Sequence, residues 1–218
     1  MGGLIIDLTS GQQSVCGSSL LSHNRALTAA QCWRSRRHEG KRLLVVLGSL
    51  RLFSGGRRVE TNKVLVHENY DKILLHNDIA VIILPTILFT NSIRPINIAE
   101  GNQSYVGDTA TAVGFGRTGH SEEDGISRQQ QLRFVGLQVI STNECARVYG
   151  LNYVTNSTLC VSGSGGRSIC GGDQGGPLIF NHQVIGVTSI NAATGCEKNR
   201  PTGFTRVPSF HSWIRANM

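Results

Sequence analysis

Long apolar runs, internal repeats and low-complexity segments are missing from this 218-residue chain. A membrane-spanning helix needs about 18 consecutive apolar residues, so we expect no such helix and no membrane partner. The first residues, Met1, Gly2 and Gly3, lack the basic, apolar and cleavage regions of a signal peptide. If the protein is exported, we expect the chain shown to be a processed, recombinant or truncated form.

The sequence also lacks the motifs that are typical of metal-binding sites. No two cysteines have a C-x-x-C spacing, and the seven histidines are scattered along the chain. This excludes the usual zinc sites, which need closely spaced cysteine or histidine ligands. We expect no metal, no cofactor and no nucleic-acid partner.

Six cysteines are present, and their even number indicates an oxidising compartment. Pairing six cysteines allows 15 connectivities, and the sequence alone leaves them all open. We expect a secreted, extracellular protein that is monomeric.

Short strands separated by turn residues predict an all-β fold of the barrel or sandwich type. A single all-β unit of this length is ordinary. The expected strands are residues 43–47, 64–67, 80–84, 109–113, 132–140, 178–180 and 184–190. Residues 120–131 form a polar segment that we expect to be an exposed loop, and Phe210, Trp213 and Ile214 recur at helical spacing, which predicts a short C-terminal helix over 208–218.

Three motifs occur in a fixed order. They are TAAQC at residues 28–32, NDIA at 77–80 and CGGDQGGP at 170–177. Together they resemble the trypsin/chymotrypsin family of serine proteases, and the last segment is similar to insect chymotrypsin-like enzymes. The resemblance places the triad positions at Gln31, Asp78 and Gln174, where the family has histidine, aspartate and serine.

Two of these three side chains cannot perform the family's chemistry. A serine becomes a nucleophile when an imidazole takes its proton, and a buried carboxylate orients that imidazole. Gln31 can hydrogen-bond Asp78, but its amide does not titrate near neutral pH. Gln174 has no nucleophilic atom. We therefore expect a proteolytically inactive chain with a degenerate triad.

The resemblance also implies a fold and a cysteine pairing. It implies two six-stranded antiparallel barrels, the first over about 1–98 and the second over about 106–207, followed by the helix at 208–218. The expected cleft lies between the barrels. The implied disulfides are Cys16–Cys32, Cys145–Cys160 and Cys170–Cys196.

The same resemblance assigns the neighbours of the triad. Gly172 and the backbone N–H of Gln174 would form the oxyanion hole. Ser168 would be the floor of the specificity pocket, as in chymotrypsin-like members, while Asn191 and Thr202 stand where smaller residues are usual and should narrow it. Ser189 would support Asp78.

The start of the chain departs from the family pattern. Residues 1–6 look like the first barrel strand, so we expect the family's activation segment to be missing. Asp173, which in the family pairs with the new N-terminal ammonium, would then lack its partner. An unpaired carboxylate is costly if buried, and we expect it to leave the oxyanion loop poorly ordered.

The net charge of +7 is concentrated between residues 31 and 63, where nine basic residues face two acidic ones. By resemblance this region forms two surface loops beside the cleft. The expected basic patch comprises Arg34, Arg36, Arg37, Lys41, Arg42, Arg57 and Arg58. Because Arg57 and Arg58 stand in a loop that holds calcium in some members, where acidic ligands are needed, no calcium is expected.

Three hypotheses about function remain open at this stage. The first is an inactive protease homologue that binds a protein or a sulfated polysaccharide through its basic loops, driven by electrostatics. The second is a digestive chymotrypsin-like protease, if glutamine at 31 and 174 is an artefact. The third is a degenerate copy without a function. A basic face that only aids solubility is the alternative to the partner site.

Overall fold

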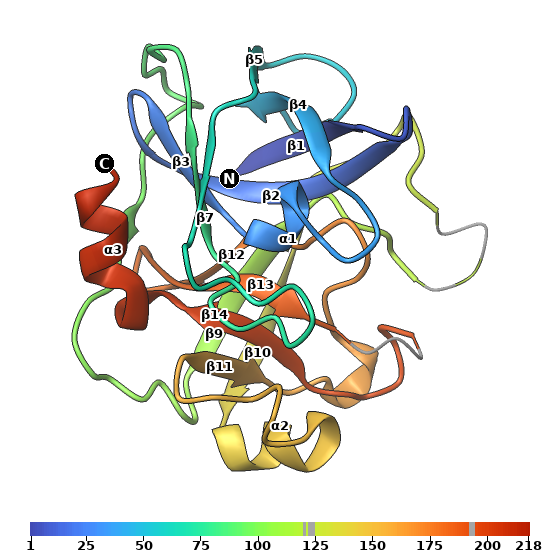
Figure 1. Cartoon of the computed structure of the whole chain (residues 1–218). Coiled ribbons are helices and arrows are strands. Elements are labelled where there is room, and N and C mark those ends of the chain that lie inside the picture. The colour runs from blue at the N-terminus through green and yellow to red at the C-terminus, as the bar shows by residue number, and fades with distance from the viewer. Residues whose placement is uncertain (120, 122–124, 192–194) are drawn as a thin grey trace.

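The computed structural model describes residues 1–119, 121, 125–191 and 195–218, in which two sheets are each curled into a barrel (Figure 1). The first sheet has the strand order β5-β4-β1-β2-β3-β7-β6. Its strands are β1 (Gly2–Leu8), β2 (Gln13–Ser22), β3 (Arg25–Thr28), β4 (Gly40–Leu47), β5 (Arg57–Thr61), β6 (Val64–Val66) and β7 (Ala80–Ile83). A single turn of helix, α1 (Ala30–Trp33), follows β3.

The first sheet closes because β5 and β6 are two parts of one nearly continuous segment. β5 pairs with β4, and β6 pairs with β7 at the other end of the sheet. Only Asn62 and Lys63 separate the two. Counted as one strand, they make the six-stranded barrel that the family resemblance implies.

The second sheet has the order β12-β9-β10-β11-β14-β13-β8. Its strands are β8 (Asn97–Ile98), β9 (Thr109–Gly114), β10 (Arg133–Ile140), β11 (Thr158–Val161), β12 (Pro177–Phe180), β13 (Gln183–Ile190) and β14 (Thr202–Arg206). Pairing of β12 with β13 closes six of these strands into a ring. β8 lies outside the ring and pairs in parallel with β13.

The position of β8 corrects the expected boundary between the barrels. Residues 97–98 were expected at the end of the first barrel, but Asn97 and Ile98 pair with Gln183 and Val184 of the second sheet. The backbone N–H of Ala99 extends this pairing by donating to Val184 O at 3.0 Å. The chain therefore reaches the second barrel before residue 99.

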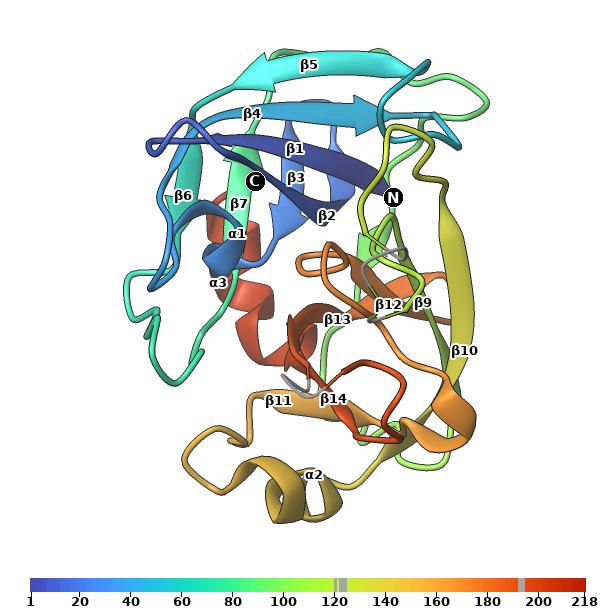
Figure 2. The ribbon, with the colours of Figure 1, turned by 90° about the vertical axis from the view of Figure 1, so that its right-hand side faces the viewer.

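Each barrel is filled by the side chains of alternate strand residues. In β9 the alternation is plain, since Ala110 and Ala112 are buried while Thr109 is exposed. The first core is larger and includes Leu4, Ile6 and Leu27. The two barrels lie one above the other in Figure 2, and residues from both meet in the region between them.

The helices lie outside the barrels. α2 (Thr142–Tyr149) starts with a capping box between Ser141 and Glu144 and is tied to β11 by the Cys145–Cys160 disulfide. A 3-10 turn, η1 (Ser164–Gly166), precedes the site. None of the described helices is long and apolar enough to cross a membrane.

The C-terminal segment forms a 3-10 turn, η2 (Val207–Phe210), and then α3 (His211–Ala216). Val207, Phe210 and Ile214 are buried in the core of the first barrel, and α3 lies beside β3 and β7 in Figure 1. The C-terminal segment therefore packs against the first barrel.

The expected polar loop at 120–131 falls partly outside the described residues, namely at 120 and 122–124. One described residue in it contradicts the expectation of exposure. Gln130 is only 8% exposed, because its side chain donates to Gly116 O and its backbone carbonyl accepts from Leu52 N.

Candidate active site

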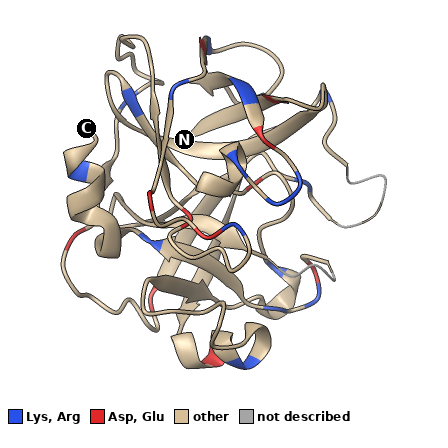
Figure 3. Ribbon diagram, in the orientation of Figure 1, with Lys and Arg blue, Asp and Glu red and all other residues tan. Residues whose placement is uncertain are grey.

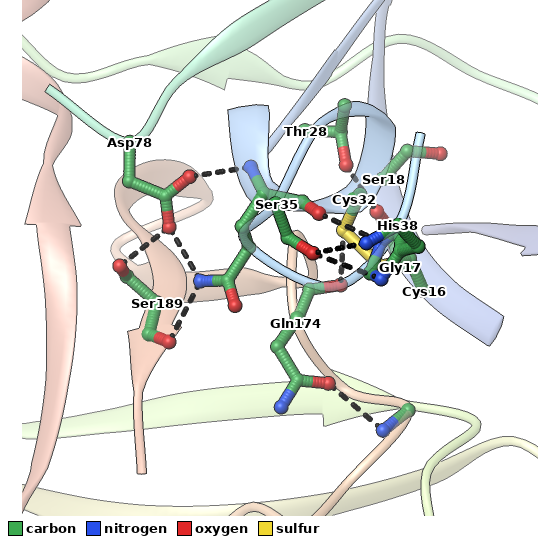
Figure 4. The surroundings of a disulfide bond; sticks show 12 residues. Cys16, Gly17, Ser18, Thr28, Cys32, Ser35, His38, Asp78, Gln174 and Ser189 are labelled. Carbon is green, nitrogen blue, oxygen red and sulfur yellow. Dashed lines mark hydrogen bonds between the residues drawn. A yellow bond between two sulfur atoms is a disulfide. The ribbon is translucent and has the colours of Figure 1, made fainter. Parts of the chain in front are cut away.

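Asp78 lies at the junction of the two barrels and is completely buried. It precedes β7 of the first barrel, whereas Ser189 and Thr205 reach it from β13 and β14 of the second. The Ser189 hydroxyl donates to Asp78 Oδ2 at 2.6 Å (Figure 4). The Thr205 hydroxyl donates to the Asp78 backbone carbonyl at 2.8 Å. Burial raises the pKa of the Asp78 carboxyl, and the donated hydrogen bonds oppose that rise.

Gln31 supplies the other donors to this carboxylate. Its backbone N–H donates to Asp78 Oδ1 at 2.8 Å and its side-chain Nε2 donates to Oδ2 at 2.5 Å. The same Nε2 donates to Ser189 O at 2.9 Å. Both amide hydrogens are therefore committed, and the amide holds the carboxylate without offering a site for a mobile proton.

Gln174 bends its side chain back onto its own loop. Its Oε1 accepts the backbone N–H of Gly172 at 2.9 Å, visible in Figure 4 as the bond at the end of the labelled side chain. Gly172 has a φ of +98°, which favours glycine. The N–H that the family resemblance assigns to the oxyanion hole is thus occupied by the chain's own amide oxygen.

The nitrogen of the Gln174 side-chain amide contacts a residue that the resemblance assigns to the specificity pocket. Gln174 Nε2 donates to Asn191 Oδ1 at 3.2 Å. Deeper in the pocket, Ser168 Oγ lies 3.0 Å from Thr202 Oγ1, and Thr202 is 1% exposed. The pocket residues assigned by the resemblance therefore make two separate hydrogen-bonded pairs, Gln174 with Asn191 and Ser168 with Thr202.

Asp173 is held by backbone donors. Its Oδ1 accepts the N–H of Gly116 at 2.6 Å and its Oδ2 accepts the N–H of Cys170 at 3.0 Å. Burial raises the pKa of the Asp173 carboxyl to about 6, because the two backbone hydrogen bonds offset only part of the desolvation. Asp173 and Arg117 both line a cavity of about 190 Å³.

The basic residues do not form one continuous patch. Lys41 and Arg42 lie at the start of β4, whereas Arg57 and Arg58 pair with Leu47 and Val46 at its other end. Some of the charges are also matched locally. Arg34 pairs with Glu39 at 3.1 Å, Arg42 bridges Asp7 at 2.7 Å and Glu60 at 3.1 Å, and Arg58 donates to Leu52 O.

A groove next to Gln31 brings together residues that sequence reasoning separated or missed. Arg36, Arg37 and His38 line it from the loop after α1, and Lys72 and Ile73 line it from the loop before β7. Nothing in the sequence singled out Lys72, because its approach to Arg36 and Arg37 depends on how the two loops pack.

Three disulfides are formed in the structure, with the pairing that the resemblance implies: Cys16–Cys32, Cys145–Cys160 and Cys170–Cys196. The first joins β2 to α1 directly behind Gln31. In the described part of the chain, no three histidine, cysteine, aspartate or glutamate side chains are grouped closely enough to hold a metal ion.

Comparisons with known proteins agree with this architecture. The family model described as Trypsin matches residues 4–214. Brachyurin of Leptuca pugilator is 37% identical over 205 residues, covering 92% of this chain and 86% of that protein. Collagenase of Hypoderma lineatum is 32% identical over 220 residues, covering 99% of this chain and 80% of that protein. The solved structure of HL collagenase matches with a TM-score of 0.89 at 31% identity, over 99% of this chain and 91% of that one.

The fold and the relatives define the class: the chain belongs to the trypsin family. Within that family it carries glutamine at residues 31 and 174.

Proposed function

We propose that this chain is a proteolytically inactive member of the trypsin family that acts by binding a partner. The observation that carries the proposal is the side chain of Gln174. It has no nucleophilic atom, and its Oε1 accepts the Gly172 N–H at 2.9 Å. A scissile carbonyl would therefore meet neither an attacking group nor a free donor at this point.

The absence of a base supports the same conclusion. Gln31 donates both of its side-chain hydrogens and has no group that titrates near neutral pH. Loss of one triad member in such enzymes lowers turnover by up to about a million-fold. Asp78 keeps three donors, which gives it a structural role at the junction of the barrels.

A serine–histidine pair does exist beside the groove, and its geometry argues against a replacement nucleophile. His38 Nε2 lies 3.1 Å from the carbonyl oxygen of Gln31, so it carries a hydrogen, and His38 Nδ1 lies 2.9 Å from the Ser35 oxygen. The Ser35 oxygen, however, also accepts the backbone N–H groups of Arg37 and His38. These bonds lower its electron density and fix it in a turn.

The binding role rests on the excess of positive charge between residues 31 and 63, part of which lines the groove beside Gln31. A positively charged concave surface attracts acidic proteins or sulfated polysaccharides and speeds their association. Three disulfides are typical of exported proteins, so we propose that the partner is met outside the cell.

A fluorophosphonate probe tests inactivity directly, because it labels only activated serine nucleophiles. The purified chain is treated beside an active trypsin-family enzyme and beside a heat-denatured sample of itself. We expect no labelling of the folded chain and no cleavage of a fluorescent casein substrate. Stoichiometric labelling, mapped by mass spectrometry to Ser35 or to any other residue in the cleft, would refute the proposal.

A further inference from the structure

The groove beside Gln31 has a volume of about 440 Å³ and an unbalanced set of charges. Arg36 and Arg37 line it from the loop after α1, and Lys72 lines it from the loop before β7. Among the described residues that line it, none is an aspartate or a glutamate. A concave surface that carries charge of one sign concentrates the field and favours an anionic ligand.

The three cations at the groove are free to bind a ligand. Among the described residues, no ion pair involves Arg36, Arg37 or Lys72, and all three are exposed. Neighbouring arginines differ, since Arg34 and Arg42 already face carboxylates of the chain. In Figure 3, Lys and Arg segments lie along the loop that joins α1 to β4, and others are spread over the rest of the ribbon.

The loop that carries two of these cations is held in shape. Ser35 N donates to His38 O at 2.9 Å, and the Ser35 oxygen accepts the N–H groups of Arg37 and His38. The His38 ring then ties the loop to the Gln31 carbonyl. A loop fixed in this way loses little conformational entropy on binding, which raises affinity for a fitting ligand.

The rest of the lining is neutral and partly apolar. Val15, Ile73 and Leu75 provide aliphatic surface, and Gln31 and Gln174 provide amides at the inner end. A polypeptide offers backbone amides and aliphatic side chains to such a surface and carboxylates to its cations. Arginine also binds a carboxylate through two parallel hydrogen bonds.

We propose that this groove binds an extended acidic segment of a partner protein, with its carboxylates on Arg36, Arg37 and Lys72. The proposal rests on the function proposed above, because an active protease would cleave such a segment. A sulfated polysaccharide fits less well, since it needs a continuous line of cations. Arg42 is already paired, and Arg57 lies at the far end of β4.

The test measures fluorescence anisotropy of a fluorescein-labelled peptide of alternating glutamate and leucine, with the same peptide carrying glutamine for glutamate as a second probe. Three proteins are compared: the parent, the groove variant Arg36→Ser/Arg37→Ser/Lys72→Ser, and the control variant Arg51→Ser/Arg57→Ser/Lys63→Ser. The control loses the same charge at exposed residues that do not line the groove. Thermal unfolding verifies that all three fold, and mass spectrometry records whether the peptide stays intact.

We expect the groove variant to bind the acidic peptide about tenfold to a hundredfold more weakly than the parent, because three ion pairs are lost, while the control changes by about twofold or less. Equal weakening in both variants would mean nonspecific charge attraction and overturn the proposal. Heparin binding that depends on the groove, without peptide binding, would assign the groove to a polysaccharide and overturn it too. Cleavage of the peptide would instead refute the inactive function, while an intact but unbound peptide refutes only the groove.

Discussion

Asp173→Asn is a substitution for which the structure gives a defined pH window. Burial raises the pKa of the Asp173 carboxyl from 3.8 to about 6. The difference is about two pH units, and each corresponds to about 1.4 kcal/mol. At neutral pH the charged carboxylate therefore destabilises the folded state by about 3 kcal/mol relative to the protonated form.

The sign of the pH dependence follows from proton binding. Between about pH 4 and about pH 6 the folded protein holds a proton on Asp173 that the unfolded chain has released. The contribution of Asp173 to the free energy of unfolding thus falls as the pH rises through this window, and it is constant above it. The Asp173→Asn variant has no titrating group here, so this contribution disappears.

The variant also loses a hydrogen bond, because an amide can accept from Gly116 N or from Cys170 N but not from both. This loss costs about 1 kcal/mol. We expect the variant to be more stable than the parent by about 2 kcal/mol at neutral pH and slightly less stable near pH 4.

Urea unfolding of both proteins from about pH 4 to about pH 8, followed by tryptophan fluorescence, measures this difference. The other titrating groups are common to both proteins, so their effects cancel when the two curves are subtracted. Parallel curves across the whole range would show that Asp173 titrates normally in the folded state, and would refute the reasoning.

Three further predictions concern the site and its support. The double reversion Gln31→His/Gln174→Ser should turn over an apolar chymotrypsin-type substrate far more slowly than the same protein with Asn191→Gly and Thr202→Ala added, because the resemblance places Asn191 and Thr202 where smaller residues are usual; equal kcat/KM values would contradict this. Ser189→Ala should lower the free energy of unfolding by about 1 kcal/mol, measured with urea, because the buried Asp78 carboxylate loses one of its three donors; an unchanged free energy of unfolding would contradict this. Replacing Cys145 and Cys160 by alanine should cost about 3 kcal/mol, given their separation of 15 residues; an unchanged melting temperature would count against it.

Strands with strong periodicity were predictable from the sequence. The predicted strands at 109–113 and 184–190 lie within β9 (Thr109–Gly114) and β13 (Gln183–Ile190), because local patterns of apolar and β-branched residues mark them. The helix α2 was not predicted, although Ser141 and Glu144 have the spacing of a capping box, which is typical of a helix start. β8 carries too few residues for any pattern, and only its pairing with β13 defines it.

The sequence gives the number of charged residues in the first barrel, but it does not show which of them form ion pairs with one another. Arg42 meets Asp7 from a strand 35 residues away and Glu60 from a neighbouring strand. Such pairs depend on the register of β4 against β1 and β5. The same dependence explains why Lys72, distant in sequence, joins Arg36 and Arg37 at one groove while Arg57 does not.

The side chain of Gln174 shows most clearly what sequence could and could not supply. Its identity alone predicts that the nucleophile is lost. Its conformation, with Oε1 on Gly172 N and Nε2 on Asn191 Oδ1, depends on the loop that surrounds it. This conformation adds a second barrier, because a ligand that enters the cleft as a substrate does must displace the amide from both partners. The acidic segment proposed above would instead be held by Arg36, Arg37 and Lys72, which make no ion pair among the described residues and therefore need not give up a partner to bind it.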